Sequence, residues 1–227
     1  DPRSDRVVFS PLRDKELGLP RYASGYVRQV PGTKLAAGEI EFGVDPYRAL
    51  YLADLGATMK GEATWKRVVG PEDKVVDTAI GGGYVYLRSS KRAPRFEILR
   101  MPLASPDLAK AEVVMPASAS VIVDVRAARD ALYVVRRDGA THSLWRIAHK
   151  PGATPERVAL PFEGAVEMNG ASSRIDGVVF DLSGWTRATK PWVYDPVASS
   201  VIQLPFVAPG AYDAPDDIVA REIRYRS

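Results

Sequence analysis

Three stretches of the sequence end in the same way: Val113-Val114-Met115-Pro116, Val158-Ala159-Leu160-Pro161 and Val201-Ile202-Gln203-Leu204-Pro205. Their closing prolines lie 45 and 44 residues apart, and Pro71 stands another 45 residues before the first of them. Short apolar runs that repeat with a period in the mid-forties, without a helical pattern, are typical of four-stranded blades arranged around an axis. The sequence therefore predicts an all-β chain that forms a β-propeller of four-stranded antiparallel blades.

Each repeat divides into four strand-length segments that are rich in Val, Ile and Tyr. The first three segments of successive repeats are residues 75–80, 84–88 and 96–101, then 121–125, 132–136 and 144–148, then 165–168, 178–182 and 192–194. The fourth segment is the run that ends at the repeated proline. Turn residues such as Gly81-Gly82-Gly83 and Arg129-Asp130 separate the first two segments, which indicates hairpins and antiparallel pairing.

The pattern is looser toward the N-terminus. Residues 39–42, 49–52 and 65–69 fit three strands of a shorter blade, residues 6–10 and 22–30 resemble two strands of an incomplete one, and residues 218–225 fit a last strand. We therefore predict a single propeller domain with very little helix and about five blades. Their approximate limits are residues 1–37 (partial), 38–71, 75–116, 120–161 and 165–227.

Composition excludes several classes of protein. The chain has 227 residues, of which 46% are hydrophobic, and no apolar run approaches the roughly 20 residues of a membrane helix. Cysteine is absent, which excludes disulfides, thiolate catalysis and cysteine-based zinc sites. The 31 basic and 28 acidic residues are interspersed, and the basic stretch 88–95 is expected to be a solvated loop. We predict neither a membrane nor a nucleic-acid partner, and the sequence selects no compartment.

The sequence offers few candidates for catalysis or metal binding. Its two histidines, His142 and His149, are expected on surface loops, and it has no Gly-x-Ser-x-Gly elbow and no phosphate-binding glycine loop. Asp77 and Asp124 occupy comparable places in two blades, but the last blade offers only Glu167 nearby. We therefore predict no catalytic residue, no cofactor and no metal in this chain.

Several segments resemble the prolyl oligopeptidase family. Residues 84–99 place an Ala-Pro dipeptide between two strands, as that family does, and residues 160–166 are similar to its Leu-Pro-x-x-Gly passage. Residues 179–191 resemble its aromatic and serine-containing stretch before a proline. The resemblance extends over residues 45–227, and residues 221–227 are similar to the strand that precedes the family's α/β-hydrolase domain.

The resemblance implies a function for this chain within a larger enzyme. In such serine peptidases the catalytic triad belongs to the hydrolase domain, while a seven-bladed propeller covers the active site and admits only short peptides. This chain would then be a non-catalytic portion that gates and positions short proline-containing peptides for the α/β-hydrolase domain of the parent chain, inactive by itself. Residues 42–46 resemble a loop that faces the substrate cavity, which makes Val44 and Asp45 candidate cavity-lining residues.

Two other classes of function stay open at this point. The chain fits a stand-alone propeller that binds a protein or peptide at one face, or a metal-dependent hydrolase or lactonase-like propeller. Fewer than seven blades also leave three arrangements: further blades in the parent chain, a smaller closed ring, or two chains that associate through open blade edges.

Overall fold

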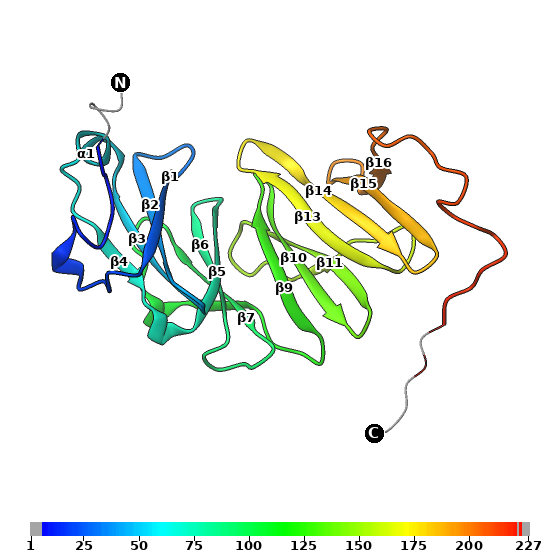
Figure 1. Cartoon of the computed structure of the whole chain (residues 1–227), viewed down its shortest axis with the longest axis horizontal. Coiled ribbons are helices and arrows are strands. Elements are labelled where there is room, and N and C mark those ends of the chain that lie inside the picture. The colour runs from blue at the N-terminus through cyan, green and yellow to red at the C-terminus, as the bar shows by residue number, and fades with distance from the viewer. Residues whose placement is uncertain (1–5, 222, 224–227) are drawn as a thin grey trace. The chain divides into compact units, whose positions relative to one another are not determined.

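The computed structural model describes residues 6–221 and 223 of the chain. The chain divides into two compact units, Asp1–Val113 and Val114–Ser227. The described residues form four sheets, each built of four strands that are consecutive in the chain and pair in order (Figure 1). This arrangement confirms the predicted fold class, an all-β chain of four-stranded antiparallel blades.

The first sheet differs from the prediction in its N-terminal strand. Its members are β1 (Ser24–Gln29), β2 (Leu35–Phe42), β3 (Asp45–Asp54) and β4 (Lys66–Val69). Strand β1 pairs with β2 from Ser24 opposite Glu41 to Gln29 opposite Ala36, and so completes this sheet. Residues 6–10 form no strand. The partial blade predicted for residues 1–37 is therefore no separate sheet, and the described residues form four sheets where about five blades were predicted.

An aromatic cluster explains why residues 6–10 do not become a strand. The ring of Phe9 packs against Trp65 with ring centroids 4.4 Å apart, and against Tyr51 at 5.6 Å. Gly38 makes room for it, because a Cβ at that position would lie 2.7 Å from the Phe9 ring. Phe9 is 7% exposed, so its burial on the face of the first sheet holds the N-terminal segment there.

The structure contains one short α-helix among its described residues, α1 (Leu55–Lys60). The Asp54 side chain accepts a hydrogen bond of 2.8 Å from the Ala57 amide, and Gly61 ends the helix in the left-handed conformation. Further short 3-10 turns are Lys15–Leu17, Pro71–Asp73 and Leu108–Lys110. The low helix content agrees with the prediction.

The other three sheets follow the predicted repeat. The second consists of β5 (Val75–Gly81), β6 (Tyr84–Ser89), β7 (Glu97–Pro102) and β8 (Glu112–Met115); the third of β9 (Val121–Ala127), β10 (Ala131–Asp138), β11 (Thr141–Ala148) and β12 (Glu156–Arg157); the fourth of β13 (Ala165–Ser172), β14 (Ile175–Gly184), β15 (Arg187–Asp195) and β16 (Ser200–Gln203). Most predicted segments lie within these strands.

Two local predictions are wrong, and a third concerns residues that are only partly among the described ones. The run 158–160 was expected to be a strand, but β12 ends before it, and Val158 instead donates its amide to the Leu144 carbonyl at 2.9 Å. His142 was expected in a loop and lies on β11. Of the strand predicted over residues 218–225, residues 218–221 form no strand, and residues 222, 224 and 225 lie outside the described ones.

The third and fourth sheets pack through a shared hydrophobic core. Fully buried side chains of the third sheet, Tyr133, Val135 and Leu144, belong to the same cluster as Phe180 and Leu182 of the fourth. Burying each of these side chains contributes about 1.5–3 kcal/mol relative to leaving it exposed. A corresponding core joins the first and second sheets within the other unit, with Leu50, Leu87 and Met101 among its buried members.

A polar network also joins the third and fourth sheets, at their β9–β10 and β13–β14 turns. The Asp130 carboxylate accepts hydrogen bonds from the Tyr133 hydroxyl, from Arg146 Nε and from the Gly177 amide, each at 2.9 Å. Beside it, the Arg129 guanidinium donates two hydrogen bonds, of 2.7 and 2.8 Å, to the Asp176 carboxylate. These hydrogen bonds and ion pairs thus fix the position of the two sheets relative to each other at this end.

A buried tyrosine makes the stability of the other unit depend on alkaline pH. Tyr86 is fully buried, and burial is the main cause that raises its pKa from 10.0 to about 12. Because the folded-state pKa lies above the unfolded one, the tyrosine's contribution is fully present below pH 10.0 and is lost as pH rises toward about 12. The unfolding free energy should fall across this window. Denaturant unfolding at several pH values should show a shallower decline in Tyr86→Phe, and parallel declines in the two proteins would contradict this.

Candidate functional site

The meander of each sheet decides which loops share one end of it. In a four-stranded antiparallel sheet whose strands pair in chain order, the turn between strands two and three and the exit from strand four lie at the same end. In the third and fourth sheets these segments are the β10–β11 turn, the β14–β15 turn and the connection from β12 to β13. We call this the 2–3 end of the Val114–Ser227 unit.

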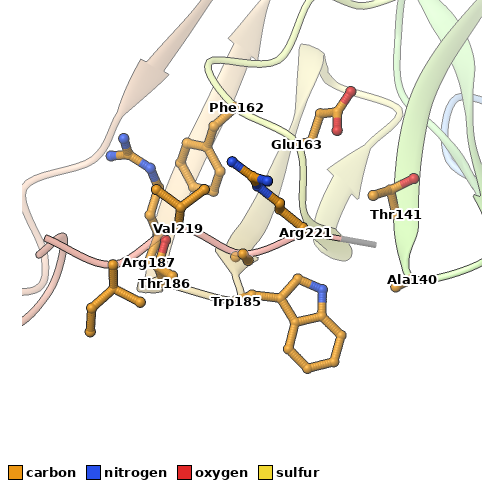
Figure 2. Close-up of a pocket in the computed structure, with 12 residues that line it drawn as sticks. Ala140, Thr141, Phe162, Glu163, Trp185, Thr186, Arg187, Val219 and Arg221 are labelled. Carbon is orange, nitrogen blue, oxygen red and sulfur yellow. The ribbon is translucent and has the colours of Figure 1, made fainter. Parts of the chain in front are cut away.

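A cavity of about 570 Å³ opens at the 2–3 end. Its walls come from the two turns, from the β12–β13 connection and from a segment near the C-terminus, as Figure 2 shows. The residues that line it are Ala140, Thr141, Phe162, Glu163, Gly184, Trp185, Thr186, Arg187, Ile218, Val219, Ala220 and Arg221. This volume falls within the range of small-molecule and peptide-residue pockets, roughly 300–1,000 Å³.

Backbone contacts fix the β12–β13 connection that carries Phe162 and Glu163. The His142 amide donates a hydrogen bond of 2.8 Å to the Gly164 carbonyl, which ties the connection to the start of β11. Gly164 also lies directly against the Ser183 carbonyl oxygen, and a Cβ at this position would overlap that oxygen. The connection is therefore held between β11 and β14, and the two side chains that precede Gly164 keep their place in the cavity wall.

An aromatic and cationic stack forms one side of the cavity. The Arg187 guanidinium carbon lies 5.1 Å from the centroid of the Phe162 ring, and Phe162 in turn contacts Trp192 edge-on, with centroids 6.2 Å apart. Gly184 lies beside this stack, since a Cβ there would come within 3.4 Å of both the Phe162 ring and Arg187 Cβ. Such contacts hold a guanidinium in place while its N–H groups stay available to a ligand.

The segment near the C-terminus is attached to β15 before it reaches the cavity. The Ala188 amide donates to the Asp213 carbonyl at 2.8 Å, and Lys190 Nζ lies 2.5 Å from the Asp213 carboxylate. The same ammonium donates to the Ala208 carbonyl at 3.1 Å. The hydrogen bond from Lys190, joined by that from the Gly210 amide, lowers the pKa of Asp213. This anchor brings residues 218–221 to the cavity as its fourth wall.

The side chains that line the cavity suit the binding of a ligand. Its hydroxyl groups belong to Thr141 and Thr186, and nucleophilic catalysis would require a base oriented toward one of them. The nearest imidazole in sequence, His142, is engaged through Nδ1 with the Val166 backbone at 3.0 Å. What the cavity offers is an exposed indole, a phenyl ring, two guanidiniums and one carboxylate, which is a set suited to recognition.

The site residues predicted from the sequence lie in the other unit. Val44 is fully exposed at the tip of the β2–β3 turn, and the Asp45 carboxylate accepts a hydrogen bond of 2.8 Å from the Tyr47 amide. The β2–β3 turn joins strands two and three of its sheet, as the β14–β15 turn does in the fourth sheet. The cavity-lining role of Val44 and Asp45 stays a prediction.

The acidic candidates for a metal are used locally. Asp77 accepts the Thr78 amide at 2.9 Å, and Asp124 accepts the Val125 amide at 2.8 Å. Among residues 6–221 and 223, no three His, Asp or Glu side chains come together in a way that could hold a metal ion. His149 Nε2 lies 2.9 Å from the Ala128 carbonyl, so this ring takes part in a backbone contact as well.

Ion pairs account for charges in the basic stretch 88–95. Lys91 Nζ lies 2.8 Å from Asp73, Arg92 Nε lies 2.9 Å from Glu97, and the Arg88 guanidinium packs over the Phe96 ring. These contacts belong to the second sheet and its loops. In the part of the chain that the structure describes, no helix has the length and apolar character of a membrane span.

Sequence reasoning missed two exposed side chains of the cavity, Trp185 and Arg187. Both belong to the segment 179–191, and Phe162 belongs to the segment 160–166, so two segments that were noted for their family resemblance meet here. The available signal was a tryptophan beside a glycine between the predicted strands 178–182 and 192–194, where an apolar side chain has no core to enter. Trp185 is indeed 79% exposed.

A family model decides the relationship of the chain. The model described as the prolyl oligopeptidase N-terminal beta-propeller domain matches residues 39–191, well over half of the chain. The chain belongs to this family. The match includes the cavity residues of both 2–3 turns and of the β12–β13 connection, and it ends within β15. No curated protein matches the chain.

Solved structures of the prolyl oligopeptidase family have the same fold. Prolyl oligopeptidase B from Galerina marginata, bound to a 35mer hydrolysis and macrocyclization substrate, is similar over 88% of this chain and 28% of its own, with 16% identity and a TM-score of 0.70. Oligopeptidase B from Trypanosoma brucei with covalently bound antipain is similar over 80% of this chain and 27% of its own, with 13% identity and a TM-score of 0.66. This chain thus spans about a quarter of the length of these proteins.

Proposed function

We propose that this chain is the propeller portion of a prolyl oligopeptidase-like serine peptidase, and that it gates and positions short proline-containing peptides for an α/β-hydrolase domain. The family match over residues 39–191 is the observation that carries this proposal. The cavity at the 2–3 end supports it, because three of its four walls come from segments inside that match and present aromatic and charged groups to solvent. The proposed division of labour leaves the acyl-transfer chemistry to the hydrolase domain.

Gating would follow from the rigidity of the sheets. A peptide that reaches a catalytic domain along a propeller must fit between loops that are pinned by backbone contacts, such as the connection held by His142 and Ser183. A short flexible peptide can enter in an extended conformation, whereas a folded chain would have to unfold first. Val44 and Asp45, on the β2–β3 turn of the first sheet, are proposed to contact the peptide substrate.

The test separates binding from turnover. We expect the purified chain to leave a chromogenic proline-dipeptide reporter intact, and the parent protein that includes a hydrolase domain to cleave it. Turnover by the 227-residue chain at a rate that scales with its concentration would overturn the division of labour. A reading frame that stops at Ser227 would instead favour the alternative, a stand-alone propeller that binds peptides or proteins.

A further inference from the structure

Two large apolar side chains at the cavity are exposed to solvent. Trp185 is 79% exposed and Val219 is 77% exposed, and both line the same cavity. Tryptophan is costly to leave in water, and exposed indoles are enriched where a partner is bound. Figure 2 shows the guanidinium groups of Arg187 and Arg221 on either side of the Phe162 ring, with the Trp185 indole apart from them. The exposed indole therefore offers a stacking surface for a ligand side chain.

The two arginines that line the cavity differ from those arginines of the fold that have a carboxylate partner. Arg28, Arg100 and Arg146 each form an ion pair with a carboxylate. Arg187 and Arg221, by contrast, form no ion pair with any residue that the structure describes. The Phe162 ring holds Arg187 in place at 5.1 Å without occupying its N–H groups. Each guanidinium in this partly enclosed site can bind a carboxylate with paired hydrogen bonds.

The remaining carboxylate narrows the class of ligand. Glu163 lines the cavity beside these arginines and, like them, is in no ion pair with a described residue. A nucleic acid would bring a row of phosphates past this carboxylate, which would repel them. A peptide can offer a carboxylate to the arginines, and its backbone N–H groups can donate hydrogen bonds to Glu163. The arrangement therefore favours a peptide over a polyphosphate.

We propose that this cavity binds an acidic peptide segment, attracted by the positive charges of Arg187 and Arg221, with a neighbouring proline or aromatic residue stacked on Trp185. The proposal rests on the proposed function, because it names the kind of peptide that the propeller positions. It adds a preference for an acidic residue next to the apolar one. Since the carboxylate contacts are close to solvent, the preference should weaken as salt is added.

The experiment compares two blocked peptides that differ in one group, Ala-Pro-Phe-Glu and Ala-Pro-Phe-Gln, by calorimetric titration of the 227-residue chain. The Glu peptide should bind about tenfold more tightly than the Gln peptide. Arg187→Ala and Arg221→Ala should each remove most of this preference, by about three- to fivefold. Trp185→Ala should weaken both peptides by a similar factor, about fivefold, because stacking does not depend on the carboxylate.

Arg174→Ala is the matched control. Arg174 is an exposed arginine at the β13–β14 turn, at the opposite end of the fourth sheet, so its removal changes net charge equally without touching the cavity. It should leave the Glu preference intact. Equal affinities for the two peptides, or an equal loss in Arg174→Ala, would overturn the acidic preference while leaving the proposed function standing. Tighter binding of a short single-stranded oligonucleotide would overturn the peptide assignment, and failure of both peptides to bind would count against both proposals.

Discussion

Replacing Gly177 with alanine should destabilise the Val114–Ser227 unit by about 4 kcal/mol. Gly177 has a φ of 85°, a conformation that L residues rarely adopt, and a Cβ there would overlap the Tyr194 carbonyl oxygen on β15. Relief of this overlap requires β14 and β15 to separate, and it also moves the Gly177 amide that donates to Asp130. Chemical denaturation followed by tryptophan fluorescence should show the loss, since Trp145, Trp185 and Trp192 all lie in this unit.

Gly152→Ala separates the clash from the cost of backbone conformation. Gly152 also has a positive φ, 69°, but a Cβ at this position would meet nothing within 4 Å. Its replacement should therefore cost only the conformational part, about 1 kcal/mol. Calorimetry should place the melting transition of Gly177→Ala about 10 °C below that of the unsubstituted protein. Similar midpoints for the two alanine variants would show that β15 yields easily, and the argument from overlap would then fail.

The repeated strands were predictable because their signals are local. Alternating Val, Ile and Tyr residues and turn clusters such as Gly81–Gly83 need only neighbouring residues to specify a hairpin, and β5, β6 and β7 lie where the sequence placed them. The N-terminal segment was not predictable in this way. Phe9 leaves an extended pattern because Trp65 and Tyr51, far away in the chain, offer it a buried site. The capping residues of α1, Asp54 and Gly61, were present in the sequence, but a six-residue helix has too few turns to show a period.

The candidate site was less accessible to sequence reasoning because it depends on register. Phe162, Trp185 and Arg187 come from two connections, and they meet only when β13, β14 and β15 pair as they do. The residue pair of β14 and β15 that lies nearest their turn is Gly184 opposite Arg187. This pairing places Trp185 in the turn, facing solvent, and sets Arg187 over the Phe162 ring. In the sequence, Trp185 stands out only as a tryptophan that lies outside the predicted strands. The Phe162 ring that positions Arg187 comes next to it only when the chain has folded.

Replacing Asp130 with alanine should remove about 3 kcal/mol of stability from the same unit. The substitution leaves three donors without their acceptor: the fully buried Tyr133 hydroxyl, Arg146 Nε and the Gly177 amide. Burial is the main cause that raises the pKa of Tyr133, and it persists in the variant, so the hydroxyl stays protonated as a donor without its acceptor. The Arg146 guanidinium would keep its longer contact to Glu156, at 3.4 Å.

Asp176→Ala is the control that distinguishes a buried network from an exposed pair. Asp176 accepts two hydrogen bonds from Arg129 at the same junction of the third and fourth sheets, but this pair is open to water and screened by salt. Its loss should change the unfolding midpoint little and less still at high ionic strength, whereas the effect of Asp130→Ala should persist there. A double-mutant cycle with Tyr133→Phe should then recover a coupling of about 1 kcal/mol, because the hydroxyl matters only while its acceptor is present. Equally small effects of the two aspartate variants would mean that neither carboxylate is needed to hold the two sheets together, and that the shared hydrophobic core alone does so.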